Sequence, residues 1–182
     1  DAWDAQLFEQ ALQHLMAMHP MLRTVFDFSG ERPLQLVLKH KATDLKAIDL
    51  RHLDATAKQS ALDQWVQDER SKPLDVSSSL WRLTVHVLSE RSFIFGMFIH
   101  HSQWDGWSLE SFATELYAAY GSLRAGTAPK HRPLPSFNQY VALEQSALSS
   151  EAHRSYWGRK LENTTVPWWT GCARRSPSRR PA

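Results

Sequence analysis

The stretch "FIHHSQWDGWSLESF", residues 98–112, decides the fold and indicates a site. An apolar run ends at His100 and His101, and an Asp-Gly pair follows at residues 105–106. A helical pattern then begins at Ser108, whose hydroxyl can cap the first turn. We therefore predict a strand that ends at the two histidines, a tight loop, and a helix whose N-terminus faces that loop.

The two histidines are expected to have different roles, because successive strand side chains point to opposite faces of a sheet. One should support the loop while the other is free for chemistry. Gly106 allows a sharp backbone turn and close approach of a ligand, and Asp105 is placed to hold a cation or orient a neighbour. A lone histidine on an apolar strand is usually a satisfied core residue, but the pair beside Asp-Gly at a loop favours a functional site.

Two other kinds of site fit this pattern poorly. Catalytic zinc takes three protein ligands in tetrahedral geometry, whereas adjacent histidines suit this badly and no third Cys or Glu follows at a suitable spacing. A Ser-His-Asp hydrolase of the α/β type needs a G-x-S-x-G elbow, and the sequence contains none. We predict that the site holds no metal.

Hydrophobic periodicity predicts an α+β fold in which a mixed sheet is flanked by helices. The apolar pattern on both faces of the segment 92–100 is typical of a strand in the middle of a sheet. No element is expected after Pro167. The predicted helices span residues 3–18, 55–70, 136–148 and 151–161, with a further helix from 108, and the predicted strands span 22–28, 33–40, 80–88 and 92–100.

Composition and length limit the class of protein. The 182 residues suffice for one domain, and 42% of them are hydrophobic. The sequence has no apolar run long enough to cross a membrane and no signal-peptide pattern at its beginning, so no membrane partner is expected. The single cysteine, Cys172, excludes an internal disulfide, and this suits a reducing cytoplasm.

The net charge of +2 depends on a basic tail. Four arginines lie among the last nine residues, within "ARRSPSRRPA", and the rest of the chain holds 17 basic against 19 acidic residues. A nucleic-acid surface gathers Lys and Arg on a folded face, whereas a Pro/Ser/Arg segment does not pack a core. We therefore predict no nucleic-acid partner.

Several segments resemble a known family. "HHSQWDG" (100–106) is similar to the H-H-x-x-x-D-G signature of condensation domains of nonribosomal peptide synthetases. "MHPMLRTVF" (18–26) is similar to the family's R-H-x-x-L-R-T-x-F segment, with Met18 in place of the first Arg. "SLWRL" (79–83) and the Tyr156, Trp157 and Leu161 set also match, so the resemblance covers about residues 3–167.

The resemblance implies the N-terminal lobe of a chloramphenicol acetyltransferase-like two-lobed fold. Residues 1–167 would form a partial condensation domain without the family's first strand and second lobe, and residues 168–182 a disordered basic tail. Such domains form an amide bond between carrier-bound aminoacyl or peptidyl thioesters. The implied partners are carrier protein domains and an adenylation domain of a parent chain. No cofactor would bind directly, since the phosphopantetheine is attached to the carriers.

The resemblance also implies residue roles. His101 would be the reactive histidine and His100 would brace it. Asp105 would pair with Arg23 on the first strand, and the backbone N–H near Gly106 would stabilise the developing oxyanion. Three further side chains would line the path of the pantetheine arms: Trp104, Trp107 and Ser108. Packing in an aromatic core accounts equally well for the presence of either tryptophan.

Two alternatives remain open at this stage. A related acyltransferase that uses coenzyme A could share the histidine motif, and acyl transfer from free acyl-coenzyme A would identify it. The chain could instead be a non-catalytic fragment that at most docks a partner, and we expect the isolated 182 residues to be inactive. Turnover by the purified chain distinguishes these cases.

Overall fold

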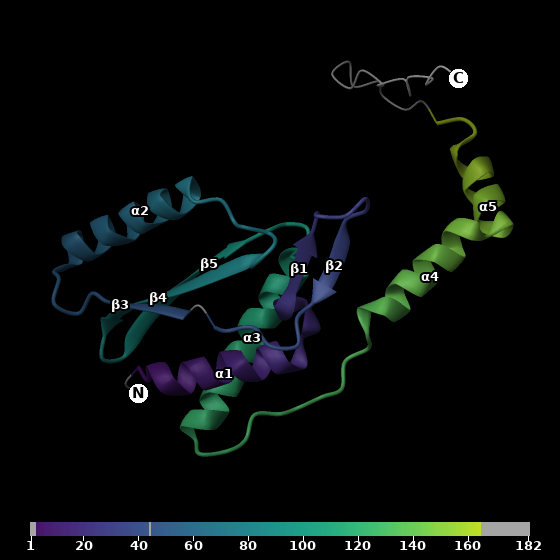
Figure 1. Cartoon of the computed structure of the whole chain (residues 1–182). Coiled ribbons are helices and arrows are strands. Elements are labelled where there is room, and N and C mark those ends of the chain that lie inside the picture. The colour runs from purple at the N-terminus through teal and green to yellow at the C-terminus, as the bar shows by residue number, and fades with distance from the viewer. Residues whose placement is uncertain (1–2, 44, 165–182) are drawn as a thin grey trace. The chain divides into compact units, whose positions relative to one another are not determined.

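The computed structural model describes residues 3–43 and 45–164, so the tail expected over 168–182 lies outside the described residues. The chain divides into two units, Asp1–Leu134 and Pro135–Ala182. The first unit contains, in order, α1 (Ala5–Met18), the 3-10 turn η1 (Pro20–Arg23), β1 (Thr24–Asp27), β2 (Leu34–Val37), β3 (Leu45–Asp49), α2 (Ala55–Ser71), β4 (Trp81–Ser89), β5 (Ser92–Ile99) and α3 (Gly106–Arg124) (Figure 1). The second unit contains α4 (Phe137–Ser149) and α5 (Glu151–Leu161).

The sheets of the first unit are mixed, which confirms the predicted α+β class. Strands β3, β4 and β5 form one sheet in that order, with β4 parallel to β3 and antiparallel to β5. Strands β1 and β2 form a separate antiparallel pair. Helices α1 and α3 cover one face of the three-stranded sheet, and α2 lies over the other (Figure 1).

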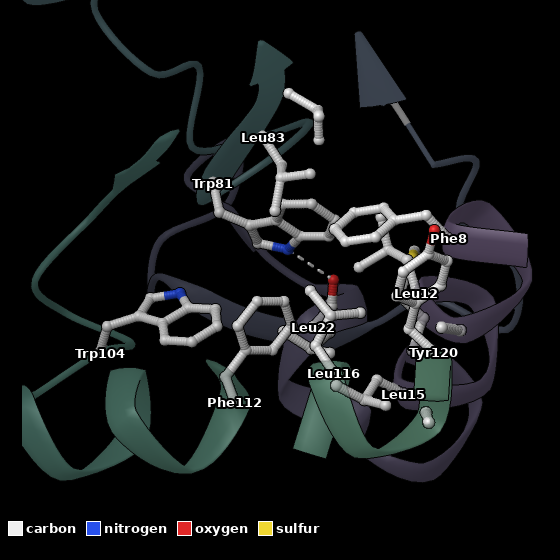
Figure 2. Packing of buried hydrophobic residues seen from close by; sticks show 14 of the residues in the cluster. Phe8, Leu12, Leu15, Leu22, Trp81, Leu83, Trp104, Phe112, Leu116 and Tyr120 are labelled. Carbon is white, nitrogen blue, oxygen red and sulfur yellow. Dashed lines mark hydrogen bonds between the residues drawn. The ribbon is translucent and has the colours of Figure 1, made fainter. Parts of the chain in front are cut away.

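The main core lies between β4 and the helices α1 and α3. Alternate β4 side chains point into it, as predicted, and none of the four is more than 4% exposed: Trp81, Leu83, Val85 and Val87. They pack against apolar residues of α1 and α3 such as Leu12 and Leu116 (Figure 2). The Trp81 indole Nε1 donates a hydrogen bond to the Leu22 carbonyl over 2.9 Å, which ties η1 to the sheet.

The opposite face of the sheet is organised around Trp65 of α2. A Cβ at Gly96 would lie 2.1 Å from this ring, so the close approach of α2 requires glycine in β5. The Trp65 ring also lies 4.9 Å from the ring of His86, at 72°. His86 is only 1% exposed, and neither of its ring nitrogens has a hydrogen-bond partner among the described residues. Burial lowers the pKa of His86.

Two expectations for the strands were wrong, and one strand was missed. β5 lies at the edge of the three-stranded sheet, and β4 is the central strand, buried on both faces. β3 was not predicted, because the five residues "LKAID" are too short to show a clear strand pattern, and in the structure they are largely exposed. Leu22 and Arg23 belong to η1 instead of a strand, since Pro20 at its first position favours a helical turn.

Helix α3 begins two residues earlier than expected, and Asp105 instead of Ser108 is its N-cap. The Asp105 Oδ1 accepts hydrogen bonds from the Ser108 backbone N–H (2.7 Å) and hydroxyl (2.6 Å). These bonds lower the pKa of Asp105. Gly106 is the first helical residue and has no positive φ, so the sharp turn expected to need glycine is not there. A Cβ at Gly106 would meet no heavy atom within 4 Å.

The expected ion pair between Asp105 and Arg23 is not formed within the described residues. The Arg23 guanidinium instead donates to main-chain carbonyls, with Nε 2.7 Å from the Met16 oxygen and a second nitrogen bonded to the Leu38 oxygen. Arg23 therefore joins the end of α1 to the residues that follow β2. The Asp105 carboxylate is instead bonded to Ser108 at the start of its own helix.

The second unit is a pair of helices, as predicted over 136–148 and 151–161. Ser136 caps α4 and Ser150 caps α5, each accepting a backbone N–H from the first turn. Neither helix has a buried residue. Within the described residues of the whole chain, no helix is both long and apolar enough to cross a membrane.

The separate roles of Asp105 and Arg23 predict additive effects on stability. Asp105→Ala removes the α3 cap and should lower the unfolding midpoint by about 2–4 °C, whereas Asp105→Asn, which keeps a cap acceptor, should cost less. Because the Asp105 pKa is lowered, its contribution is present above about pH 4 and is lost as the pH falls through the lowered pKa. Arg23→Ala should also lower the unfolding midpoint, and in the double variant the two decreases should add in full. A double variant that loses clearly less than the sum in thermal unfolding would show that the two side chains interact.

The buried His86 predicts a loss of stability in mild acid. Because its pKa is lowered in the folded state, the unfolded chain binds the proton more readily. The free energy of unfolding should therefore decline as the pH falls below about 6.5. His86→Leu should remove this slope without lowering stability at neutral pH, since it deletes two unpaired polar atoms. Urea titrations between pH 7 and 5 measure this, with the exposed His52→Leu as control, and an unchanged slope in His86→Leu would contradict the assignment.

Candidate functional site

A tight turn carries the two histidines from β5 to α3. The His100 N–H donates to the Leu80 carbonyl over 2.9 Å, which continues the strand ladder one residue past Ile99. The Gln103 N–H then donates back to the His100 carbonyl over 3.1 Å and closes the turn. The predicted order of strand, tight loop and helix is therefore confirmed.

His101 is held through one ring nitrogen. Its Nδ1 lies 3.1 Å from the Trp104 carbonyl oxygen. Because a carbonyl only accepts hydrogen bonds, Nδ1 must carry the proton, and in the neutral ring Nε2 then carries the lone pair. The side chain is exposed. In the neutral form of the ring, Nε2 is thus the nitrogen that can accept a proton.

His100 has the opposite tautomer. Its Nδ1 accepts the backbone N–H of Ser102 (3.2 Å) and lies 2.7 Å from the Ser102 hydroxyl. A backbone N–H only donates, so the proton of the neutral His100 ring is on Nε2. By strand alternation His100 follows Phe98 on the α2 face of the sheet, where Phe98 lies 5.7 Å from the Arg82 guanidinium. His100 therefore braces the turn from its own side.

A pocket of about 370 Å³ lies beside this turn, at the start of α3. Four residues expected at the site contribute to its wall, whereas His100, His101, Gly106 and Arg23 do not. The lining residues are His19, Met21, Leu22, Gln103, Trp104, Asp105, Trp107, Ser108, Ser111 and Phe112.

The two tryptophans of the loop have different environments. Trp104 is 5% exposed and belongs to the core, where its ring meets that of Phe112 edge-on at 5.3 Å (Figure 2). Trp107, in the first turn of α3, is 82% exposed. Trp104 is thus a core residue that also lines the pocket, whereas the Trp107 ring lines the pocket and is largely exposed to solvent.

Sequence reasoning missed three polar residues, Ser102 in the histidine turn and His19 and Gln103 in the wall of the pocket. Ser102 and Gln103 lie within the "HHSQWDG" motif, but only the folded turn reveals their hydrogen bonds. His19 lies within "MHPMLRTVF", and its Nε2 is 2.5 Å from Oε2 of Glu115 on α3. The other oxygen of Glu115 is 2.5 Å from Arg132. No local pattern signals the contacts of Glu115 with His19 and Arg132, because these partners are far apart in the sequence.

The polar groups of this region suit an organic ligand better than a metal ion. Nδ1 of each histidine is already engaged in a hydrogen bond. Within the residues that the structure describes, no group of three or more His, Cys, Asp or Glu is placed to hold a metal. What remains is one basic nitrogen, an apolar pocket and a helix N-terminus.

The sequence matches one family over most of its length. A family model described as Condensation domain matches residues 1–170. The chain is 37% identical over 184 residues to the AMB antimetabolite synthetase AmbE of Pseudomonas aeruginosa, a match that covers 97% of this chain and 9% of AmbE. It is 28% identical over 165 residues to the chondramide synthase cmdD of Chondromyces crocatus, covering 88% of this chain and 4% of that protein.

The fold has a counterpart among solved structures. It resembles the starter condensation domain of the rhizomide synthetase RzmA with a TM-score of 0.77 and 20% identity, over 90% of this chain and 40% of that one. The chain thus spans a small part of the relatives it matches, in agreement with one lobe of a two-lobed fold. The family match includes the histidine turn, the Arg23 segment and the helices that follow, and the chain belongs to the condensation domain family.

Proposed function

We propose that the chain is part of a condensation domain that forms amide bonds between carrier-bound aminoacyl or peptidyl thioesters in nonribosomal peptide synthesis. Membership of the family supports this reaction class. The observation that carries the proposal is the hydrogen bond of His101 Nδ1 to the Trp104 carbonyl, because it leaves Nε2 as an exposed base. We place the reaction in the cytoplasm, within a longer parent protein.

In the proposed reaction, the amine of the acceptor aminoacyl thioester attacks the thioester carbonyl of the donor. As the C–N bond forms, the amine transfers a proton to His101 Nε2 and the carbonyl oxygen takes up negative charge. When the tetrahedral species collapses, the C–S bond breaks and the thiolate leaves. The proton held by His101 then neutralises the thiolate, so the products are an amide and a free carrier thiol.

The magnitudes assign His101 a limited share of the acceleration. A free α-amino group has a pKa of about 7.7–8.0, so deprotonation at pH 7 costs only about 1 kcal/mol. Holding two tethered reactants in line can contribute roughly 7–11 kcal/mol. General base action of the kind proposed for His101 is typically worth about 10²–10⁴ in rate. Most of the catalysis is therefore positioning, and His101 removes the proton as the bond forms.

The neighbouring residues have supporting roles in this proposal. His100 fixes the turn through Ser102, Asp105 starts α3 at the site, and Arg23 fastens the end of α1. The N–H groups at the start of α3, around Gly106, are placed to favour negative charge on the carbonyl oxygen. The anionic Asp105 at the same helix end limits that contribution.

The substrates reach the site on carrier domains. We assign Trp104, Trp107 and Ser108 to the path of the phosphopantetheine arm, since they line the pocket beside His101 and Trp107 offers an exposed ring for an apolar chain. The partners in the parent protein are carrier domains and an adenylation domain. The phosphopantetheine belongs to the carriers, and no other cofactor is needed by the reaction.

Replacement of the base tests the proposal directly. In the intact parent, His101→Ala should lower the rate of amide formation by about 10²–10⁴ and leave the unfolding midpoint unchanged, because the side chain is exposed. A two-carrier condensation assay measures the rate, and the exposed His52→Ala is the control. Near-normal product formation by folded His101→Ala protein would refute the assignment.

Gly106 offers a test of substrate approach. A Cβ at this position meets no protein atom within 4 Å, so Gly106→Ala should fold normally and gain up to about 1 kcal/mol of stability. If the thioester passes close to the start of α3, kcat/KM should fall about tenfold through the added methyl. Gly121→Ala is the matched control, because its Cβ also meets no atom within 4 Å but lies far along the same helix. Equal activity of both variants would place the thioester elsewhere.

The isolated 182 residues are expected to form no amide. They span 40% of the RzmA domain they resemble, and they expose many large apolar side chains, including Leu34, Val37 and Trp107. Exposed apolar surface favours association, so low solubility is expected as well. Size-exclusion chromatography with the two-carrier assay checks both points. A monodisperse monomer that turns over like the intact parent would contradict them.

A further inference from the structure

The outer edge of β5 has free hydrogen-bonding groups. β5 lies at the end of the three-stranded sheet, and among the residues that the structure describes no further strand pairs with it. The His100 N–H donates inward, to the Leu80 carbonyl beside β4. Because alternate residues of a strand turn their N–H and C=O groups to the same side, the groups of the odd-numbered residues point outward. These residues are Phe93, Phe95, Met97 and Ile99, and no described residue bonds to their N–H groups.

This edge lacks the features that protect an edge strand from pairing. β5 spans eight residues, "SFIFGMFI", without a charge or a proline. The strand at the opposite edge of the sheet, β3, has five residues and carries Lys46 and Asp49. Short length and charged side chains protect an edge, whereas a long uncharged edge is a template for another strand. Of the two edges of this sheet, the β5 edge is therefore the one open to pairing.

Apolar side chains flank the open edge on both faces of the sheet. Ile94 lies on the same face as Gly96, the face covered by α2, and is 44% exposed. On the other face, the Tyr117 ring of α3 lies 5.5 Å from the Phe95 ring and is 46% exposed. A strand added to β5 would therefore lie against apolar surface above and below the backbone, and this burial favours the pairing.

The pattern of β5 is complementary to a second copy of the same strand. In an antiparallel pair, residues whose N–H and C=O groups point outward must lie opposite residues of the same kind. The register that pairs all four sets Phe93 opposite Ile99 of the second copy. It sets Phe95 opposite Met97 and Gly96 opposite itself, on a two-fold axis. Since the strand has no charge, this symmetric pairing brings no like charges together.

We infer that two copies of this chain associate through their β5 edges, antiparallel and about a two-fold axis at Gly96. The two three-stranded sheets then form one six-stranded sheet, in which β5 of one copy lies beside β5 of the other. Every outward N–H from Phe93 to Ile99 meets a carbonyl oxygen of the second copy. The inference does not depend on the proposed function, because it rests on main-chain geometry and uses no histidine chemistry.

Sedimentation equilibrium of the 182-residue chain tests the association. We expect twice the mass of one chain for the unmodified protein. Met97→Pro should weaken the dimer about tenfold or more, because it removes an outward donor that the β4–β5 ladder does not use. Ile94→Lys should do the same by placing a charge on the edge. The matched control is Ile48→Lys on β3, which is 38% exposed at the opposite edge and should remain dimeric.

The fold of each variant is checked by circular dichroism and by its unfolding midpoint. A monomeric unmodified chain would leave this edge to a strand of another kind and overturn the inference. A dimer that persists unweakened in folded Met97→Pro and Ile94→Lys would place the interface elsewhere and also overturn it. So would a folded Ile48→Lys that loses the dimer to the same extent.

A disulfide tests the register. Ile94 lies opposite Phe98 of the second copy as a non-hydrogen-bonded pair, whose side chains are close enough for a disulfide. In a Cys172→Ser background, the double variant Ile94→Cys, Phe98→Cys should form a covalent dimer on mild oxidation. Within one strand these positions are too far apart to bond to each other. Ile94→Cys alone is the control, and a double variant that cross-links no more than this control would refute the pairing.

Discussion

The burial of Trp104 is the constraint on which the site depends. Its ring is fixed in the core against Phe112, and its carbonyl oxygen, on the same residue, holds Nδ1 of His101. The packing of the core therefore determines the tautomer of an exposed histidine three residues earlier. Because the indole also donates a hydrogen bond to Oε1 of Gln103, one buried residue holds both the proposed base and the side chain that precedes it in the turn.

The surrounding fold keeps this arrangement rigid from several directions. The Trp81 indole fastens η1 to the central strand, and His19 of the same segment contacts Glu115 of α3. On the other face, Trp65 packs against Gly96 and His86, so that α2 supports the strand that delivers the histidines. A helix capped by Asp105 then leaves the turn in a fixed direction. Such support is what a site needs when most of the catalysis comes from positioning.

The sequence predicts the parts of this structure that depend on local patterns. The change from strand to helical periodicity around His100 and Asp105 indicated the turn, and the alternation from Trp81 to Val87 indicated the buried face of β4. Contacts between distant segments were not predictable. β5 is apolar on both faces because helices cover both sides of the sheet, and periodicity cannot distinguish that from a central strand. Arg23 finds main-chain carbonyls instead of Asp105, a choice that depends on how the ends of α1 and β2 meet.

Within the site, the residue types were predictable and their hydrogen bonds were not. The roles of His101 and its neighbours remain predictions, although the opposite tautomers of the two histidines supply a physical reason for choosing His101 that the sequence lacks. Nitrogen-15 NMR of the imidazole rings in the labelled chain tests that reason most directly. We predict that at neutral pH His101 carries its proton on Nδ1 and His100 on Nε2. A spectrum in which His101 is protonated on Nε2 would contradict the account, because the nitrogen proposed to accept the proton of the amine would already be occupied.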